Sequence, residues 1–268
     1  MRLKILLKSV DYSPLSINYN YALSAAIYKL LQLGSPDFSK FLHETGFQLN
    51  GKSYKLFTFA LRLQDYSIDG NKLNFISPYA SLYISSPLIE DFVKNIVIGA
   101  FINQKIELFS DFLKTNFLIH QAELLPEPEF NSVSYFNPIS PIVLSTKKIF
   151  KGIPSQHFFR YDDDINEINR VLNINLTNKY KLLHQHLYQD GGVHLSWDEK
   201  FILYNKNNKN KFSKITTITK SLANPIHIKG ITVPFTLSGD PKLIKIGYQT
   251  GFGEKNSMGF GLVDSISK

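Results

Sequence analysis

A glycine-rich stretch near the C-terminus has the residue types and spacing best suited to binding chemistry. Residues 247–261 read G-Y-Q-T-G-F-G-E-K-N-S-M-G-F-G. Glycine lets the backbone adopt positive φ and approach a ligand closely, and successive free N–H groups form an anion-binding concavity. The stretch therefore predicts a phosphate-contacting loop, with a tight surface turn as the alternative. The residues expected to contact the phosphate are Gly251, Gly253, Lys255, Asn256, Gly259 and Gly261.

The order of elements around this stretch argues against a nucleotide-cofactor site. Asp240 and Pro241 are typical of a helix N-cap and first helical position, so a short helix precedes the glycines. The residues after Gly259 alternate as in a strand. Dinucleotide and Walker-type loops follow a strand and open a helix, which is the reverse order.

The other residues that could do chemistry limit the possible reactions. The chain has no cysteine, which excludes disulfides, thiolate catalysis and zinc–thiolate sites. His184 and His186 are two residues apart and His194 follows a Gly-Gly pair, without a carboxylate pattern of known ligand spacing. We therefore predict no metal site, and catalysis must use His, Tyr, Lys, Ser or carboxylate side chains.

Hydrophobic periodicity in the first half predicts a β-α-β-β-α-β order, which is the ferredoxin-like pattern. Leu23, Ile27, Leu30 and Leu31 follow helical spacing, and Gly34 ends that pattern. The expected strands are 2–10, 55–63, two short segments around Pro78, 105–109 and 113–125, and the expected helices are 20–33, a short one from 35, and 87–101.

The second half predicts a repeat of the same plan after a proline-containing linker at 125–129. The expected elements are a strand at 141–146, a helix at 163–187, strands at 193–204 and 231–237, a short helix from 241 and a final strand. Residues 205–220 carry five lysines and no acid, which favours a solvated loop slightly over a basic RNA-facing hairpin. The prediction is an α+β chain of two tandem ferredoxin-like domains, residues 1–128 and 129–268.

Charge and composition favour a polyanionic partner. The net charge is +8, and residues 1–128 carry 12 Lys and Arg against 11 Asp and Glu, so the excess belongs to the second half. Neutralising phosphates releases counterions, so this imbalance suits nucleic acid. The sequence shows neither a window apolar enough for a membrane span nor a secretory signal, which predicts a cytoplasmic protein without a membrane partner.

Four sequence blocks resemble a known family. The glycine-rich G-Y-Q-T-G-F-G-E-K-N-S-M-G-F-G-L-V is similar to the signature of CRISPR-associated repeat-processing endoribonucleases, within the repeat-associated mysterious protein superfamily. The segments I-N-Y-N-Y-A-L-S-A-A-I-Y, F-L-H-E-T-G-F and Y-K-L-F-T-F resemble the same family in order and spacing. The resemblance spans the chain and is weakest from about residue 147 to 230. It implies tandem ferredoxin-like domains and metal-independent cleavage of CRISPR precursor RNA within each repeat, with no cofactor.

The resemblance also implies three catalytic residues. The family tyrosine falls on Tyr28 in A-A-I-Y, the histidine on His43 in F-L-H-E, and the lysine on Lys55 in Y-K-L-F-T-F. Lys52 lies three residues upstream, where it competes with Lys55 for the catalytic role and is otherwise a candidate RNA contact. Lys55 is preferred because it adjoins the matching L-F-T-F block.

These residue types suit cleavage of RNA by its own 2′-hydroxyl. The reaction needs a base or positioning group near the 2′-oxygen, an acid near the 5′-oxygen and positive charge near the phosphorane. We assign His43 as general acid, Tyr28 as base or 2′-hydroxyl positioner, and Lys55 as electrostatic stabiliser. The products would be a 2′,3′-cyclic phosphate and a 5′-hydroxyl.

The expected partner is CRISPR repeat RNA, bound by a monomer or a homodimer, with a CRISPR effector complex as a further candidate partner. Retention of the processed guide RNA is also predicted. The alternative function is that of a non-catalytic repeat-RNA-binding subunit of an effector complex with the same fold. The retained Tyr28, His43 and Lys55 favour the enzyme.

Overall fold

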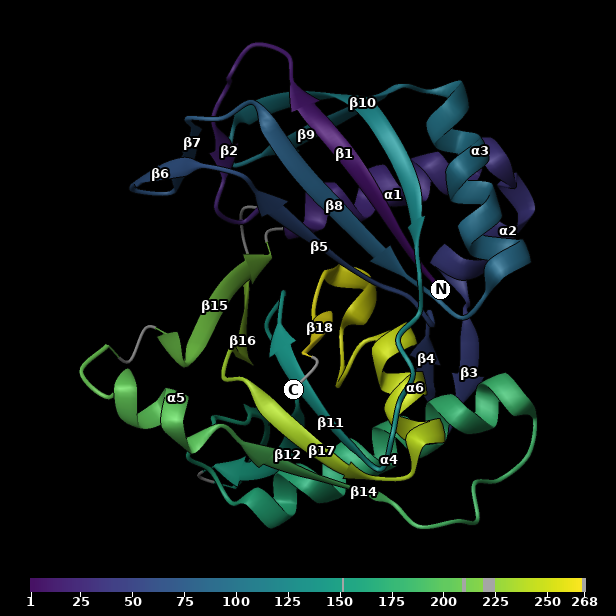
Figure 1. The fold of residues 1–268 in the computed structure, drawn as a ribbon, viewed down its shortest axis with the longest axis vertical. Coiled ribbons are helices and arrows are strands. Elements are labelled where there is room, and N and C mark those ends of the chain that lie inside the picture. The colour runs from purple at the N-terminus through teal and green to yellow at the C-terminus, as the bar shows by residue number, and fades with distance from the viewer. Residues whose placement is uncertain (151, 209–210, 219–224, 267–268) are drawn as a thin grey trace.

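Two antiparallel sheets form the body of the molecule, one above the other in Figure 1. The structure is a computed structural model that describes residues 1–268 except 151, 209–210, 219–224 and 267–268. In the described ranges, no helix combines the length and the apolar character that crossing a membrane requires.

The first sheet has the ferredoxin-like strand order. Its strands in spatial order are β5 (Thr58–Leu63), β8 (Tyr79–Ser85), β1 (Arg2–Ser9), β10 (Leu113–Leu125) and β9 (Lys105–Ser110). Strand β9 is joined to β10 by a tight turn and lies at the edge of the sheet. The other four strands, numbered by their order in the chain, lie side by side as second, third, first and fourth. Helix α1 (Asn20–Gly34) follows the first strand, and α3 (Lys94–Ile102) follows the third.

The second sheet repeats this order. Its strands are β14 (Val193–Trp197), β17 (Phe235–Gly239), β11 (Val133–Pro138) and β18 (Val263–Ile266). Helices α4 (Ile165–His184) and α6 (Pro241–Thr250) follow its first and third strands. The predicted α+β fold with two ferredoxin-like units is therefore confirmed. The domain limits at residues 128 and 129 lie between the two sheets and stay a prediction.

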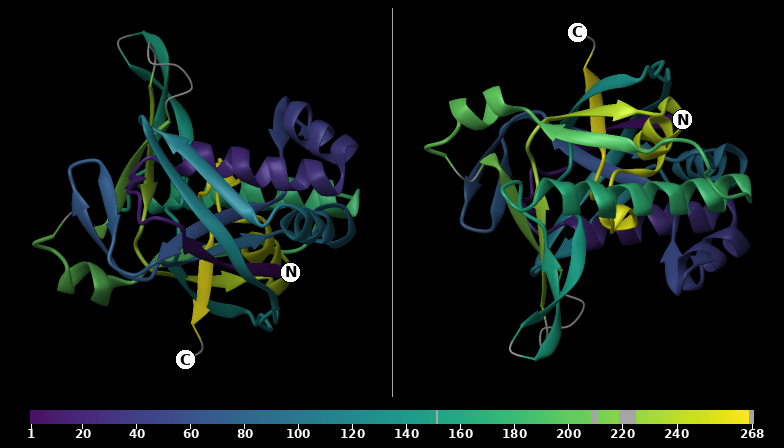
Figure 2. Two further views of the ribbon diagram at one scale, coloured as in Figure 1. Left: turned by 90° about the horizontal axis from the view of Figure 1, so that it is seen from above. Right: turned by 90° about the horizontal axis from the view of Figure 1, so that it is seen from below.

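Shorter elements decorate this framework. They are β2 (Leu15–Ser16), α2 (Pro36–Glu44), β3 (Phe47–Leu49), β4 (Lys52–Tyr54), β6 (Tyr66–Asp69), β7 (Lys72–Phe75), η1 (Ile89–Val93), β12 (Ser145–Phe150), β13 (Ile153–Phe158), α5 (Glu199–Tyr204), β15 (Ser213–Ile218), β16 (Ile226–Ile231) and η3 (Asn256–Met258). Figure 2 shows the hairpin β12–β13 extending away from the body of the molecule.

The helices form where apolar spacing and capping residues agree. Leu23, Ile27, Leu30 and Leu31 of α1 are all buried, as their spacing predicts. Helix α6 begins at the predicted cap, because the Asp240 carboxylate accepts a hydrogen bond from the Lys242 backbone N–H.

Two predicted strands of the second half are correct only in part. The first strand of the second sheet is β11. In the predicted range 141–146, only Ser145 and Thr146 belong to a strand, β12, whereas Ile142 and Val143 form single bridges and are fully buried. The apolar residues there are buried on all sides. In the sequence, such a continuous apolar run looks the same as a buried strand. The predicted strand 193–204 ends at Trp197, because Asp198 caps α5 by accepting from the Phe201 N–H.

The basic segment 205–220 is also more ordered than a solvated loop. Its part in β15 pairs antiparallel with β16 and buries Thr216 and Ile218. β-branched residues favour this extended pairing. Residues 209, 210, 219 and 220 of the segment lie outside the described residues.

Candidate functional site

Tyr28 and His43 come together because α1 and α2 follow one another around a short connection. The Ser39 hydroxyl of α2 donates to the Tyr28 backbone oxygen of α1 at 3.1 Å. The two rings then meet edge to face, with centroids 5.2 Å apart. The ring of Phe57 contacts the Tyr28 ring at 5.8 Å, also edge to face. Tyr28 is therefore held in place, while His43 lies exposed in the last turn of α2.

Lys55 joins this pair through the backbone. Its Nζ donates to the His43 carbonyl oxygen at 3.1 Å. Gly46 makes the approach possible, because a Cβ there would lie 2.8 Å from Lys55 Cδ and 2.9 Å from Lys55 Nζ, and its φ is +64°. Partial burial lowers the pKa of Lys55 below the ordinary lysine value. Lys55 precedes β5 rather than starting it, and the structure brings all three predicted residues to one place.

The environment of Tyr28 keeps its phenol protonated. Burial raises the pKa of Tyr28 well above the ordinary tyrosine value, and a side-chain hydrogen bond with Ser257 offsets part of that rise. Ser257 belongs to the glycine-rich stretch, which lies in the second half of the chain just before β18. The first half therefore supplies the three predicted residues, and the second half supplies a partner to one of them.

The glycine-rich stretch lies between the two sheets, in yellow in Figure 1, and its backbone is bound from both sides. From the first half, Asn20 Nδ2 donates to the Met258 oxygen at 3.0 Å and Thr58 Oγ1 to the Phe260 oxygen at 2.8 Å. From α4, Lys179 Nζ donates to the oxygens of Gly251 and Gly253 at 2.6 and 2.9 Å. The stretch therefore joins the two halves.

The predicted contact residues of this stretch differ in what they face. Asn256 is buried, with Oδ1 accepting from Lys179 at 2.8 Å and Nδ2 donating to the Phe252 and Phe260 oxygens. Its side chain thus binds the loop itself, and contact of Asn256 with RNA stays a prediction. Lys255, with φ of +58°, lines a pocket and has a half-exposed side chain.

The glycines allow close approach inside the protein. A Cβ on Gly259 would lie 2.7 Å from the Phe59 ring, and one on Gly261 would lie 2.1 Å from the Phe252 oxygen. A Cβ on Gly251 would meet Asn256 and Thr58, and one on Gly253 would meet the Val143 oxygen. Direct RNA contact by these four glycines stays a prediction, and of the four only Gly253 lines the pocket.

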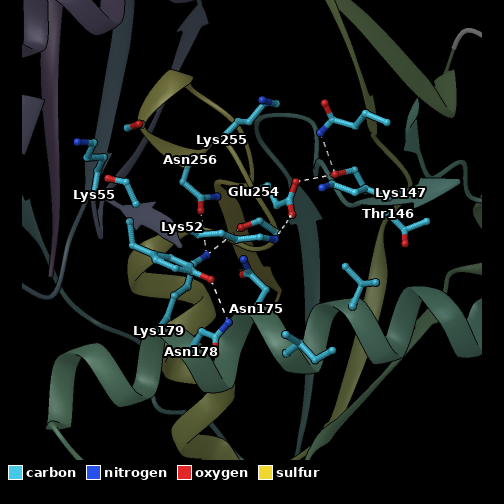
Figure 3. Close-up of a pocket in the computed structure, with 18 of the residues that line it drawn as sticks. Lys52, Lys55, Thr146, Lys147, Asn175, Asn178, Lys179, Glu254, Lys255 and Asn256 are labelled. Atoms are coloured by element: carbon cyan, nitrogen blue, oxygen red, sulfur yellow. Dashed lines mark hydrogen bonds and ion pairs between the residues drawn. The ribbon is translucent and has the colours of Figure 1, made fainter. Parts of the chain in front are cut away.

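A pocket of about 860 Å³ opens beside the three predicted catalytic residues (Figure 3). Its walls come from the β3–β4 hairpin and the chain after it, the β12–β13 hairpin, α4 and the glycine-rich stretch. Lys55 lines it, whereas Tyr28 and His43 are not among its lining residues. Its basic lining residues are Lys52, Lys55, Lys147, Arg170, Lys179 and Lys255, against the single acid Glu254. Such a balance attracts anions.

Lys52 differs from Lys55 in its surroundings. Its side chain is 66% exposed, and its Nζ lies 3.4 Å from Glu254 Oε1 across the pocket. Glu254 also accepts from the Ser145 hydroxyl at 2.7 Å. Lys52 thus contacts the opposite wall of the pocket, while Lys55 contacts the histidine segment.

Sequence reasoning missed Ser257 and Lys179. Ser257 lies inside the glycine-rich stretch but carries no pattern of its own. Lys179 had a detectable signal, because it falls on the inward stripe of α4 with Ile168, Leu172 and Leu176, where a lysine is unusual. Within the described residues, no three His, Cys, Asp or Glu side chains gather as metal ligands would.

Comparisons with known proteins identify the family. A model described as CRISPR associated protein Cas6, C-terminal, matches residues 125–265, and one for the Cas6 N-terminal region matches residues 14–123. The chain belongs to the Cas6 family. A curated relative from Methanocaldococcus jannaschii, "CRISPR-associated endoribonuclease Cas6 1", is 30% identical over 99% of this chain and 93% of its own length.

Solved Cas6 structures have the same fold. One, described as "CRISPR associated protein Cas6", is 26% identical with a TM-score of 0.74 and covers 100% of this chain and 99% of its own. Another, from "Characterization of a Cas6-related gene from Pyrococcus furiosus", is 25% identical with a TM-score of 0.81 and the same coverage. Both matches therefore cover the full length of this chain.

Proposed function

We propose that this Cas6 family endoribonuclease cleaves CRISPR precursor RNA within its repeats through attack of a 2′-hydroxyl on the adjacent phosphorus. The observation that carries the proposal is the meeting of Tyr28 and His43 rings at 5.2 Å, with Lys55 Nζ on the His43 carbonyl oxygen. The basic pocket beside them supports binding of the RNA backbone.

Each residue has a role that fits its surroundings. His43 is exposed and donates a proton to the leaving 5′-oxygen. Lys55 has two further N–H donors, which stabilise the non-bridging oxygens of the phosphorane. Tyr28 stays protonated because burial raises its pKa, so it orients the 2′-hydroxyl as a neutral hydrogen-bonding group, and the 2′ proton passes to water.

The reaction as proposed needs no metal and leaves a 2′,3′-cyclic phosphate and a 5′-hydroxyl. We also propose that the protein retains the processed RNA, since the lysines that line the pocket are present before and after cleavage. In this proposal the protein then delivers the retained RNA to a CRISPR effector complex.

A labelled repeat transcript incubated with the protein in EDTA tests the proposal. We expect discrete cleavage within the repeat, with 5′ ends that accept phosphate from a kinase without prior phosphatase treatment. His43→Ala should slow cleavage by about 10² to 10⁴-fold while RNA binding stays within a few fold, because it removes only proton transfer.

His194→Ala is the matched control, because His194 is exposed on β14 in the other half. It should cleave like the wild type. Binding of the repeat by the wild type without any cleavage would replace the proposal by the alternative of a non-catalytic RNA-binding subunit. Cleavage only after addition of a divalent metal would refute the metal-independent chemistry.

A further inference from the structure

Lys179 is a buried cation without a carboxylate contact in the part of the chain the structure describes. It lies on α4 with 2% of its surface exposed, and Glu254 attracts it only from a distance. Its three N–H donors are all used, on the oxygens of Gly251 and Gly253 and on Asn256 Oδ1, at 2.6, 2.9 and 2.8 Å. Burial of such a group is unfavourable and lowers the pKa of Lys179 to about 7, so its position calls for a compensating role.

The groups that Lys179 binds fix the glycine-rich stretch over its whole turn. Asn256, held by Lys179, donates from Nδ2 to the oxygens of Phe252 and Phe260, at 3.3 and 3.0 Å. Lys179 and Asn256 together thus bind four backbone oxygens between residues 251 and 260. The next residue, Ser257, is therefore placed by this network.

Ser257 is the point where this network reaches the reaction site. Its backbone oxygen accepts from the Ser24 hydroxyl at 2.7 Å, and Ser24 lies four residues before Tyr28 on α1. The contacts run from Lys179 to Asn256, the chain neighbour of Ser257, and from Ser257 through Ser24 to the helix that carries Tyr28.

The residue before Lys179 supports the same site from its other side. Asn178 Nδ2 donates to the Tyr54 hydroxyl at 3.0 Å, and Tyr54 is bonded in the chain to Lys55. Adjacent residues of α4 thus contact the glycine-rich stretch and Tyr54, the neighbour of Lys55 in the chain.

We infer that Lys179 is a positioning residue for RNA cleavage, acting through Asn256 and Ser257 on Tyr28. The inference rests on the proposed function. The three N–H donors of Lys179 match three acceptors. A side chain without donors at position 179 would leave buried carbonyl oxygens unpaired and let the turn of the glycine-rich stretch shift. A shift of about 1 Å at a positioned group can slow a reaction about 10²-fold.

A double-mutant cycle with Tyr28 separates positioning from a general structural effect. The variants are Lys179→Met, Tyr28→Phe and both together, measured by single-turnover cleavage at saturating RNA. We expect Lys179→Met to slow cleavage at least about tenfold, with RNA affinity changed less than about threefold. The double variant should be no slower than Tyr28→Phe alone, since both act through one group.

Lys181→Met is the matched control, because it removes a lysine from the same helix that lies near the surface rather than in the core. It should cleave like the wild type. Lys179→Gln keeps an amide N–H₂ for the loop oxygens and should recover part of the rate lost in Lys179→Met. If Lys179→Met loses its cooperative melting transition, the same cycle is run with Lys179→Gln.

The outcomes are distinguishable from failure of the proposed function. A wild type that never cleaves the repeat refutes the proposed function itself. Cleavage at the wild-type rate by a folded Lys179→Met, or independent effects that multiply in the double variant, would overturn the positioning role while leaving the function standing.

Discussion

At the scale of single residues, the two lysines near the site are distinguished by what they touch. Lys55 Nζ contacts the backbone of His43, whereas Lys52 is 66% exposed and reaches toward Glu254. Because His43 is the proposed general acid, a lysine next to it is better placed to act on the same phosphate than a lysine that contacts the opposite wall of the pocket. The structure thus favours Lys55, the residue preferred from the sequence blocks.

Lys55→Met should therefore slow single-turnover cleavage about 10² to 10³-fold, as removal of one donor to a developing oxyanion does in other enzymes. Lys52→Met should slow it by less than about tenfold, since an exposed ion pair contributes only about 0 to 1 kcal/mol. Both rates are measured at saturating RNA, with affinity determined separately. The reverse order of the two effects would transfer the catalytic role to Lys52.

At the scale of elements, the glycine-rich stretch acts as a packing device between the sheets. Its carbonyl oxygens accept from Asn20, Ser24 and Thr58 on one side and from Lys179 on the other. Its glycines lie where a side chain would strike the core, as Gly259 does against Phe59. The sequence signature therefore reports a structural requirement, whatever RNA contacts it also makes.

Gly259→Ala should be strongly destabilising, because its φ is +83° and the added Cβ would lie 2.7 Å from the Phe59 ring. Gly51→Ala is the control, since Gly51 has φ of +70° but open space around it. The control should cost about 1 to 2 kcal/mol from backbone strain alone. Gly259→Ala should cost a further 1 to 3 kcal/mol or so from overpacking. Urea unfolding measures both, and equal losses would contradict the packing role.

At the scale of the whole molecule, Arg2 contributes to the contact between the two halves. Its side chain is 2% exposed, donates to the Val263 oxygen at 2.8 Å and lies 4.0 Å from the centre of the Tyr248 ring. It also pairs with Asp264 at 3.3 Å, a carboxylate shared with Arg62. The first and last strands of the chain are thus held together by one buried side chain.

Arg2→Met should lower the free energy of unfolding by about 2 to 3 kcal/mol, because it removes charged hydrogen bonds that lie out of water. Arg62→Met removes the other partner of Asp264 but is 52% exposed, so it should cost less than about 1 kcal/mol. Chemical denaturation of the three proteins provides the comparison. Similar losses in both variants would show that the Asp264 pairing, not the buried contact, matters.

The sequence by itself determined the features that depend on near neighbours. Apolar spacing placed α1, Asp240 with Pro241 placed the start of α6, and the repeated order of elements predicted two ferredoxin-like units. The sequence blocks named Tyr28, His43 and Lys55, which the fold then brings together. These signals are local because helix periodicity and capping involve residues within a few positions of each other.

Only the tertiary structure decided which polar residues face inward and what they hold. The sequence places Lys179 on the apolar stripe of α4, but only the structure shows that it is buried against oxygens more than 70 residues away. The side chain of Asn256 completes the loop, which the sequence did not show, and its predicted contact with RNA stays a prediction. Residues 142–144 are apolar because several elements enclose them, and Ile142 and Val143 form only single bridges. Such contacts join segments distant in the chain, so no local pattern specifies them, and the packing of the two halves alone determines where each side chain lies.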